Sequence, residues 1–295
     1  MRSQRAVVTT GLAAWLLLAV VAGVTGRGSL VAVLLALAPL VLVPLGIPLT
    51  MALAPRAPTL VVVVSTAIPA GAALLLDRGA VAALLVVPWL VLAGLLASAA
   101  VRVWWSGPRR VTRLPPVAAL GYLTVGAAWL FADRAGIEPL GFSPPFVALT
   151  AVHFHHAGFV ATTILAAGMS SGGRLAAAAT ALVVVAPPVV ALGFVAVPAL
   201  LVVGAVLLTA GLWLFAGQVM LQRPGGRSGR LLLVAALAVV VPMALAVHWA
   251  TGAATGWFQP LAVPTMAMTH GVLQAFGFGL FGLLGRRAAV AEDLT

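Results

Sequence analysis

The sequence predicts an all-α fold, a polytopic bundle of about ten transmembrane helices. The chain is 63% hydrophobic and 7% charged, with a mean hydropathy of +1.20, whereas soluble domains carry roughly 25% charged residues. Apolar runs of about 20 residues, long enough to cross a bilayer, recur from end to end. These runs lack the alternation of a β-barrel, so their backbone groups must be paired within helices.

Ten apolar runs are expected to form the helices. Arginines precede the first run, as in a signal peptide, but no small-residue cleavage site with a soluble domain follows, so it is interpreted as a helix. The seventh run carries Pro187 and Pro188, which predict a kink or a break. The short link around Val197 and Pro198 divides the seventh helix from the eighth. The expected helices span residues 6–24, 30–53, 59–76, 80–101, 116–132, 145–168, 175–193, 198–221, 231–250 and 261–284.

The arginines predict the orientation of these helices. With both termini cytoplasmic, only Arg27, Arg78 and Arg134 fall in outer loops, and the other 13 of the 16 basic residues lie in cytoplasmic segments, among them Arg56, Arg109 and Arg110. This is the bias expected of inside loops. We therefore expect a single integral domain, 1–295, in the plasma membrane.

The composition also excludes several classes of protein. Cysteine is absent, which excludes disulfides and thiolate metal sites, and every basic residue is Arg, which excludes a Schiff-base lysine. The +11 charge is scattered through short loops and is no nucleic-acid footprint. No acid is expected inside a spanning segment, which disfavours carboxylate-driven ion transport and carboxylate-bound Mg²⁺.

The most informative feature is a cluster of His153, His155 and His156 in an apolar segment without charged residues. Ionisable side chains in the membrane are costly and usually functional. These histidines lie roughly 12–16 Å from the outer end of their helix, and His270 lies roughly 14 Å into the last helix. Because the hydrocarbon core is about 30 Å thick, both positions fall near its middle.

Helical geometry narrows the site. At 100° per residue, His153 and His156 lie about 60° apart, while His155 points about 160° from His153. We therefore expect His153, His156 and His270 to form the site, which is a hypothetical metal site. His155 would contact Asp133, Glu138 or another helix, and Thr269 and Gln274 would add polar groups from the last helix. The expected accessory residues are His248, Asp133, Glu138 and Gln259.

Two segments around these histidines resemble the signature segments of the YndJ-like bacterial membrane proteins. They read LTAVHFHHAGF at 149–159 and THGVLQAFGF at 269–278. The resemblance is clearest between residues 141 and 285, and segment 39–48 also looks similar. The second signature departs at Gln274, where the family pattern has Asn, so the reach of that amide differs. The resemblance implies that these segments define the protein and supplies little mechanism, although the family is sometimes labelled a transporter.

Two functional hypotheses remain open at this level. The first is an intramembrane histidine site that ligates a metal ion or haem, or performs acid–base chemistry on a small or lipidic molecule. The second is a transporter or permease that uses the histidines for substrate contact or proton relay. A third reading is a membrane scaffold whose histidines only form hydrogen bonds. Enzymatic activity, substrate and oligomeric state are left open, and the lipid bilayer is the one firm partner.

Overall fold

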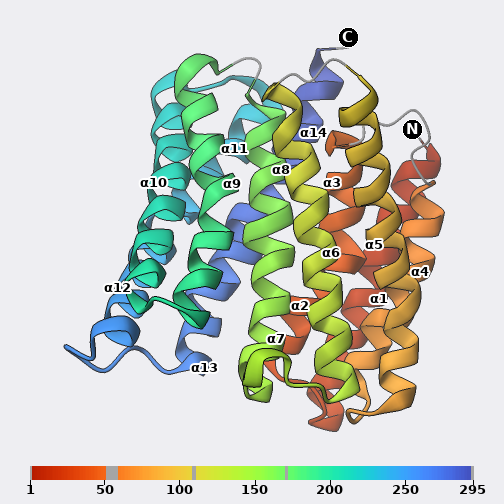
Figure 1. The fold of residues 1–295 in the computed structure, drawn as a ribbon. Helices are drawn as coiled ribbons and strands as arrows, with labels where there is room; N and C mark the ends of the chain where they lie inside the picture. The colour runs from red at the N-terminus through yellow and green to blue at the C-terminus, as the bar shows by residue number, and fades with distance from the viewer. Residues whose placement is uncertain (1, 51–58, 108–110, 170–171, 294–295) are drawn as a thin grey trace. The chain divides into compact units, whose positions relative to one another are not determined.

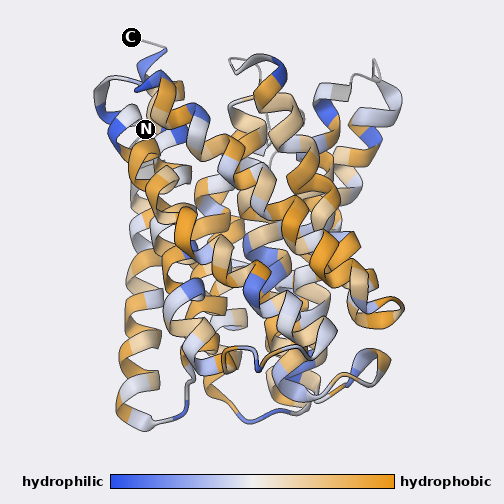
Figure 2. Cartoon of the chain, turned by 90° about the vertical axis from the view of Figure 1, so that its left-hand side faces the viewer, coloured by the Kyte–Doolittle hydropathy of each residue, from blue (hydrophilic) through white to orange (hydrophobic). Residues whose placement is uncertain are grey.

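A computed structural model describes residues 2–50, 59–107, 111–169 and 172–293. Over these residues the protein is helical and no strand occurs, which confirms the predicted fold class. Nine of the described helices are long and apolar enough to cross a membrane, and the apolar helix Leu60–Leu75 is shorter. The helices are mostly hydrophobic along their length, and hydrophilic residues gather at their ends (Figure 2).

The chain divides into two compact units, Met1–Val160 and Ala161–Thr295. The boundary falls inside the sixth spanning helix, which is continuous through this point. The expected single domain and the orientation of the termini stay predictions. The last three residues of the expected helix 30–53 lie outside the described residues, as do Arg56, Arg109 and Arg110.

The described part of the first unit contains six apolar helices, counting the sixth up to the boundary; five are long enough to cross a membrane, and Leu60–Leu75 is shorter. The second of them is α2, η1 and α3 in one run, in which η1 is a π-helical turn. The sixth is likewise α7 followed by the π-helix η6. Figure 1 shows α5 and α6 side by side in this unit. The elements are α1 (Arg2–Thr25), α2 (Leu30–Leu37), η1 (Ala38–Leu42), α3 (Val43–Thr50), α4 (Leu60–Ala72), η3 (Ala73–Leu75), α5 (Ala80–Ser106), η4 (Val111–Arg113), α6 (Leu114–Ala135), η5 (Pro139–Gly141), α7 (Pro144–His153) and η6 (Phe154–Ala161).

The core of the first unit forms around the helix Leu30–Thr50. In its most apolar window 78% of the residues are buried, including Leu35 and Leu42. A helix that is apolar all round is expected to be surrounded by others. α1 crosses it closely at Gly11, where an added Cβ would collide with the carbonyl oxygen of Leu40. The interrupted second helix is therefore packed inside this unit.

The second unit is built from the remainder of the chain. The last spanning helix of the chain contains two π-helical stretches, η7 and η8. The helix before it, Gly226–Thr255, is divided at Val239 into α11 and α12. The elements are α8 (Thr162–Ala167), α9 (Gly173–Val195), α10 (Pro198–Gln222), α11 (Gly226–Ala238), α12 (Val240–Thr255), α13 (Val263–Met266), η7 (Ala267–Gly271), η8 (Leu273–Leu280) and α14 (Phe281–Glu292).

Helices α9 and α10 form the closest helix pair of the second unit (Figure 1). The predicted division between them is confirmed, because α9 ends at Val195 and α10 begins at Pro198. The predicted break within α9 does not occur, and the helix runs through both of its prolines. On either side of these prolines, Gly204 and Gly211 of α10 let that helix pack directly against α9. Such neighbours allow membrane helices to tolerate proline.

Candidate functional site

The histidine motifs lie in helices that depart from α-helical geometry. The first motif continues from α7 into the π-helix η6, and the second spans η7 and η8. The remaining π-helix of the described residues, η1, overlaps the segment 39–48 that also resembles the family. π-Helical turns are rare and appear frequently at functional sites. Their coincidence with the three family-like segments therefore marks each segment, within its own unit, as a candidate for functional residues.

His155 is fully buried, and both of its ring nitrogens are bonded. Its Nδ1 lies 2.8 Å from the carbonyl oxygen of Ala151, and its Nε2 lies 3.2 Å from Nε1 of Trp89. A carbonyl only accepts and an indole N–H only donates, so His155 is neutral and carries its proton on Nδ1. The two rings are stacked, with centroids 6.2 Å apart. His155 thus contacts another helix, α5, which was one of the alternatives predicted for it. Neither of its ring nitrogens remains available for a ligand.

Glycine makes room for this buried ring. Gly126 of α6 faces His155, and a Cβ on it would lie 2.6 Å from the Nδ1 atom of the histidine. A contact that short requires the ring or the helix to move. One turn after His155, Gly158 faces Tyr122 of α6, and a Cβ on it would lie 2.6 Å from the Cβ atom of that tyrosine. The pair of glycines lets η6 and α6 approach closely around His155.

His156 completes the hydrogen bonding of the second helix. Its Nε2 lies 3.1 Å from the carbonyl oxygen of Leu34, so this nitrogen carries the proton and donates. The N–H of Ala38 bonds to Leu35 rather than to Leu34, and Pro39 has no N–H to offer. The histidine therefore replaces a donor that the proline removes, and its Nδ1 is the basic nitrogen.

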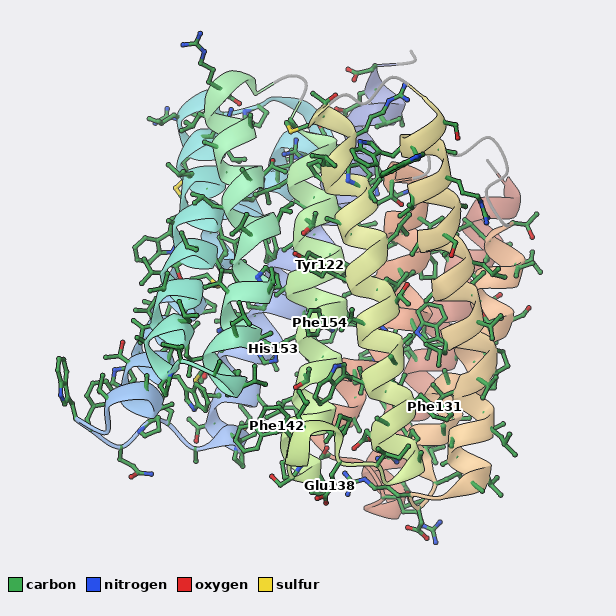
Figure 3. The ribbon with its side chains drawn as sticks, in the orientation of Figure 1. Tyr122, Phe131, Glu138, Phe142, His153 and Phe154 are labelled. Atoms are coloured by element: carbon green, nitrogen blue, oxygen red, sulfur yellow. The ribbon has the colours of Figure 1, made fainter. Side chains whose placement is uncertain are left out.

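His153 is exposed on the surface of the helix. Its Nδ1 lies 2.7 Å from the carbonyl oxygen of Leu149, one turn earlier, which leaves the proton on Nδ1 and the lone pair on Nε2. Figure 3 shows His153 near the middle of its helix and beside Phe154, whereas Glu138 lies beyond the start of that helix. Phe154 packs against Tyr122 of α6, with ring centroids 5.9 Å apart.

The angles between the histidines differ from those expected from the sequence. The expected angles hold for an unbroken α-helix, but the helix is π from Phe154 onward. A π-helix closes its turn with i→i+5 bonds and advances by less than the α-helical angle per residue. His153 and His156 therefore lie more than about 60° apart. His156 reaches α2 while His153 stays exposed, so their shared use by one ligand remains a prediction.

Asp133 also differs from its expected place. It lies inside α6 rather than in a loop, and it is 2% exposed. It accepts hydrogen bonds from Arg78, at 2.8 Å, and from Arg134, whose Nη1 also donates to the carbonyl of Leu76. The predicted placement of Asp133 in a loop is therefore wrong, since α6 runs two residues beyond it, and its charge is balanced by two arginines. A small pocket of about 80 Å³ adjoins the network and includes Glu138.

His270 donates to a neighbouring helix in the second unit. Its Nδ1 lies 2.8 Å from the carbonyl oxygen of Pro242, near the division between α11 and α12. Thr269 is exposed and donates to Thr265 on its own helix. The side-chain nitrogen of Gln274 is buried without a hydrogen-bond partner in the described part of the chain. The predicted joining of His270 to His153 and His156 stays a prediction.

The accessory histidine His248 is covered by the loop that follows α12. Its ring stacks on Phe258, with centroids 4.5 Å apart, and that phenylalanine also lies against Gly252. Trp257 is 81% exposed, and Gln259 is exposed as well. Phe258 is thus folded onto the helix, whereas Trp257 is placed as an interfacial anchor would be.

Two polar residues that the sequence reasoning missed follow η6 directly. The hydroxyls of Thr162 and Thr163 are buried, and no described atom forms a hydrogen bond with either. Other buried helical threonines, such as Thr180 and Thr209, donate to the carbonyl four residues earlier at 2.7 Å. The π-helical register ahead of Thr162 displaces that carbonyl. The sequence marks these two threonines only as adjacent hydroxyl residues that follow the histidine segment 149–159.

The grouping of His, Asp and Glu side chains decides whether they could hold a metal ion. Within either unit, the described residues contain no group of three His, Asp or Glu side chains placed to hold a metal ion. A closed structural metal site needs about four such ligands. The predicted metal site of His153, His156 and His270 stays a prediction.

A bundle of long apolar helices with a buried ionic network and polar residues in interrupted helices defines a polytopic integral membrane protein. The family model described as YndJ-like protein matches residues 33–278, and the chain belongs to this family. It is similar to the protein named "Uncharacterized membrane protein YndJ" of Bacillus subtilis (strain 168), with 25% identity over 200 residues. The match covers 66% of this chain and 36% of that relative, so the chain spans about a third of its length. No solved structure matches the chain.

Proposed function

We propose that this membrane protein uses an intramembrane histidine centre, built on His153 and His156, for acid–base chemistry on a small or lipidic molecule. One observation carries the proposal: each histidine commits one N–H to a backbone carbonyl, which fixes the tautomer and leaves the other nitrogen basic. Histidine is the side chain best suited to proton transfer near neutral pH. A ring anchored in this way presents its basic nitrogen in a fixed direction.

The exposure of His153 supports a substrate that arrives through the lipid. Its Nε2 is the basic nitrogen of an exposed ring near the middle of a spanning helix. An ionisable group in that position is costly unless it has a function. His155 has no basic nitrogen left, so its role in the proposal is to hold η6 against α5 through Trp89. Ligation of haem or an open metal ion by the same nitrogens is the closest alternative chemistry.

The experiment compares four forms of the full chain in its own membrane: wild type, His153→Ala, His156→Ala and the control His248→Ala. We expect a lipid-soluble or small product in extracts of wild-type and control membranes that is absent from the other two. The purified proteins are analysed for metal content and for a haem absorption band. A bound metal or haem lost in both site variants would replace acid–base chemistry with ligation. Identical extracts from all four forms, without metal or haem, would refute the proposal.

A transporter or permease is the second candidate, and the interrupted helices favour it. The second, sixth and tenth spanning helices each contain a π-helical stretch within their length. Membrane transporters place substrate sites at discontinuous helices near the bilayer midplane. Substrate-dependent flux in liposomes that requires His153, without chemical conversion of the substrate, would favour this candidate. Conversion in detergent without flux in liposomes would exclude it.

A further inference from the structure

Arg286 is a guanidinium fixed by three neighbours in the second unit. Its Nε lies 2.9 Å from the carbonyl oxygen of Ile164 in α8, and its Cζ lies 5.7 Å from the ring centroid of Phe215 in α10. Its flat face lies against Gly168, where an added Cβ would overlap three guanidinium atoms. The site therefore combines a helix carbonyl, an aromatic face and a glycine around one cation.

No carboxylate neutralises this cation. Among the described residues, Arg286 forms no ion pair, and its only hydrogen bond is the one from Nε. The two acids of this unit are Glu292 and Asp293, and Glu292 accepts hydrogen bonds from the backbone N–H and the hydroxyl of Ser228. Arg286 is half-buried, and the N–H groups of its two terminal nitrogens form no hydrogen bond with the described residues. A partly desolvated cation without an anion is costly, which indicates that a ligand supplies the negative charge.

The depth of Arg286 identifies the kind of anion. It lies 23 residues after Val263, the first residue of its spanning helix, and therefore roughly 30–35 Å along it. The hydrocarbon core is about 30 Å thick and the bilayer with its headgroups about 40–45 Å. Arg286 thus reaches the headgroup level of the leaflet opposite Val263. The anion available at that level is the phosphate of a phospholipid.

The chemistry of arginine fits this ligand. The planar guanidinium fork presents paired N–H donors that match two phosphate oxygens, which a lysine cannot do. Four other arginines lie near the start of α9 and α11 or at the end of α10, and together they raise the local positive potential. Such basic sites between helices bind anionic headgroups. These arginines are Arg174, Arg223, Arg227 and Arg230.

We propose that the terminal nitrogens of Arg286 bind the phosphate of an anionic phospholipid, seated between α8, α10 and α14. Phe215 and Ile164 are themselves buried, so they hold the guanidinium from the protein side and leave its terminal nitrogens to the headgroup. Gly168 is required because any side chain there would push the guanidinium away. The proposal is independent of the histidine centre, since it concerns other residues and a resident lipid rather than a substrate.

The test uses the purified full chain in a neutral detergent, with phosphatidylglycerol, phosphatidylcholine or inorganic phosphate added in parallel. Native mass spectrometry counts the retained lipid, and thermal unfolding reports stabilisation. We expect wild type to retain phosphatidylglycerol and to gain several degrees in Tm, with little effect of phosphatidylcholine. Arg286→Gln should weaken retention at least about tenfold, the loss expected for one charge-assisted phosphate contact. The control Arg174→Gln should retain the lipid.

Two further variants keep the test decisive if Arg286→Gln unfolds. Gly168→Ala leaves every charge in place but displaces the guanidinium, so it should also lose the lipid. Arg286→Lys keeps the charge without the fork and should retain it only partly. Equal loss in Arg174→Gln and Arg286→Gln would show a diffuse surface charge and overturn the proposal. The same stabilisation by inorganic phosphate and phosphatidylglycerol would show a free-anion site and overturn the lipid assignment.

Discussion

Replacing Trp89 by phenylalanine tests the assignment of His155 as a structural histidine. The change removes the only donor to Nε2 of His155, in a place where Trp89 is 1% exposed and His155 is 0% exposed. An unsatisfied buried acceptor costs about 1–3 kcal/mol. The smaller ring adds a cavity term of roughly 1 kcal/mol. We therefore expect the free energy of unfolding to fall by roughly 2–4 kcal/mol.

A double-mutant cycle isolates the hydrogen bond from the cavity. In a His155→Phe background the indole N–H of Trp89 already lacks its acceptor, so Trp89→Phe strands no acceptor and should cost no more than its cavity term. The coupling energy between the two changes should then be at least about 1–3 kcal/mol, the cost of the stranded group. The assay is reversible unfolding of the purified protein in mixed micelles, and the exposed Trp257→Phe serves as the control with no effect. A coupling energy below about 0.5 kcal/mol would refute the reasoning.

Two further substitutions test the packing and the ionic network. Gly126→Ala should destabilise by about 1–3 kcal/mol, because its Cβ would press on His155, whereas Gly121→Ala on the same helix meets open space and should be neutral or stabilising by up to about 1 kcal/mol. Thermal unfolding of the pair checks this, and equal shifts would contradict it. Asp133→Asn should cost roughly 2–3 kcal/mol, because it leaves a buried arginine without its partner while the half-exposed Arg78 is screened by solvent. Arg78→Gln should cost less than Asp133→Asn in the same assay, and the reverse order would contradict the assignment.

The fold could be predicted from the sequence because helix length in a membrane is set by bilayer thickness. The expected helices 175–193 and 198–221 agree to within two residues with the observed Gly173–Val195 and Pro198–Gln222. The last two observed helices, Gly226–Thr255 and Val263–Glu292, extend beyond the expected 231–250 and 261–284 by up to eight residues. The 80–101 helix extends further, to Ser106, because its polar end continues beyond the apolar core. The expected helix 59–76 is confirmed as the apolar helix Leu60–Leu75, although it is shorter than the nine candidate spans of the described residues.

The site was predictable only in part. Angular reasoning separated His155 from its neighbours correctly, since an α-helical and a π-helical turn both place it away from His153. The partners of these histidines were not predictable, because Trp89 and Leu34 are distant in the chain and only the fold brings them near. The expected end of the helix at residue 132 gave the wrong place for Asp133, which lies in the last turn of α6. Its two arginine partners lie 55 residues apart or adjacent in sequence, and their charges remove the cost.

The bond from His156 to Leu34 has a consequence for how the protein is made. The two residues are 122 positions apart, so the second helix enters the membrane long before its hydrogen-bond donor is synthesised. During that interval the carbonyl of Leu34 must take water or stay unpaired, which is unfavourable in lipid. The second helix can therefore complete its hydrogen bonding and packing only after the sixth helix has been inserted. Biogenesis of the first unit should accordingly proceed from the outside inward, with its most buried helix the last to be completed.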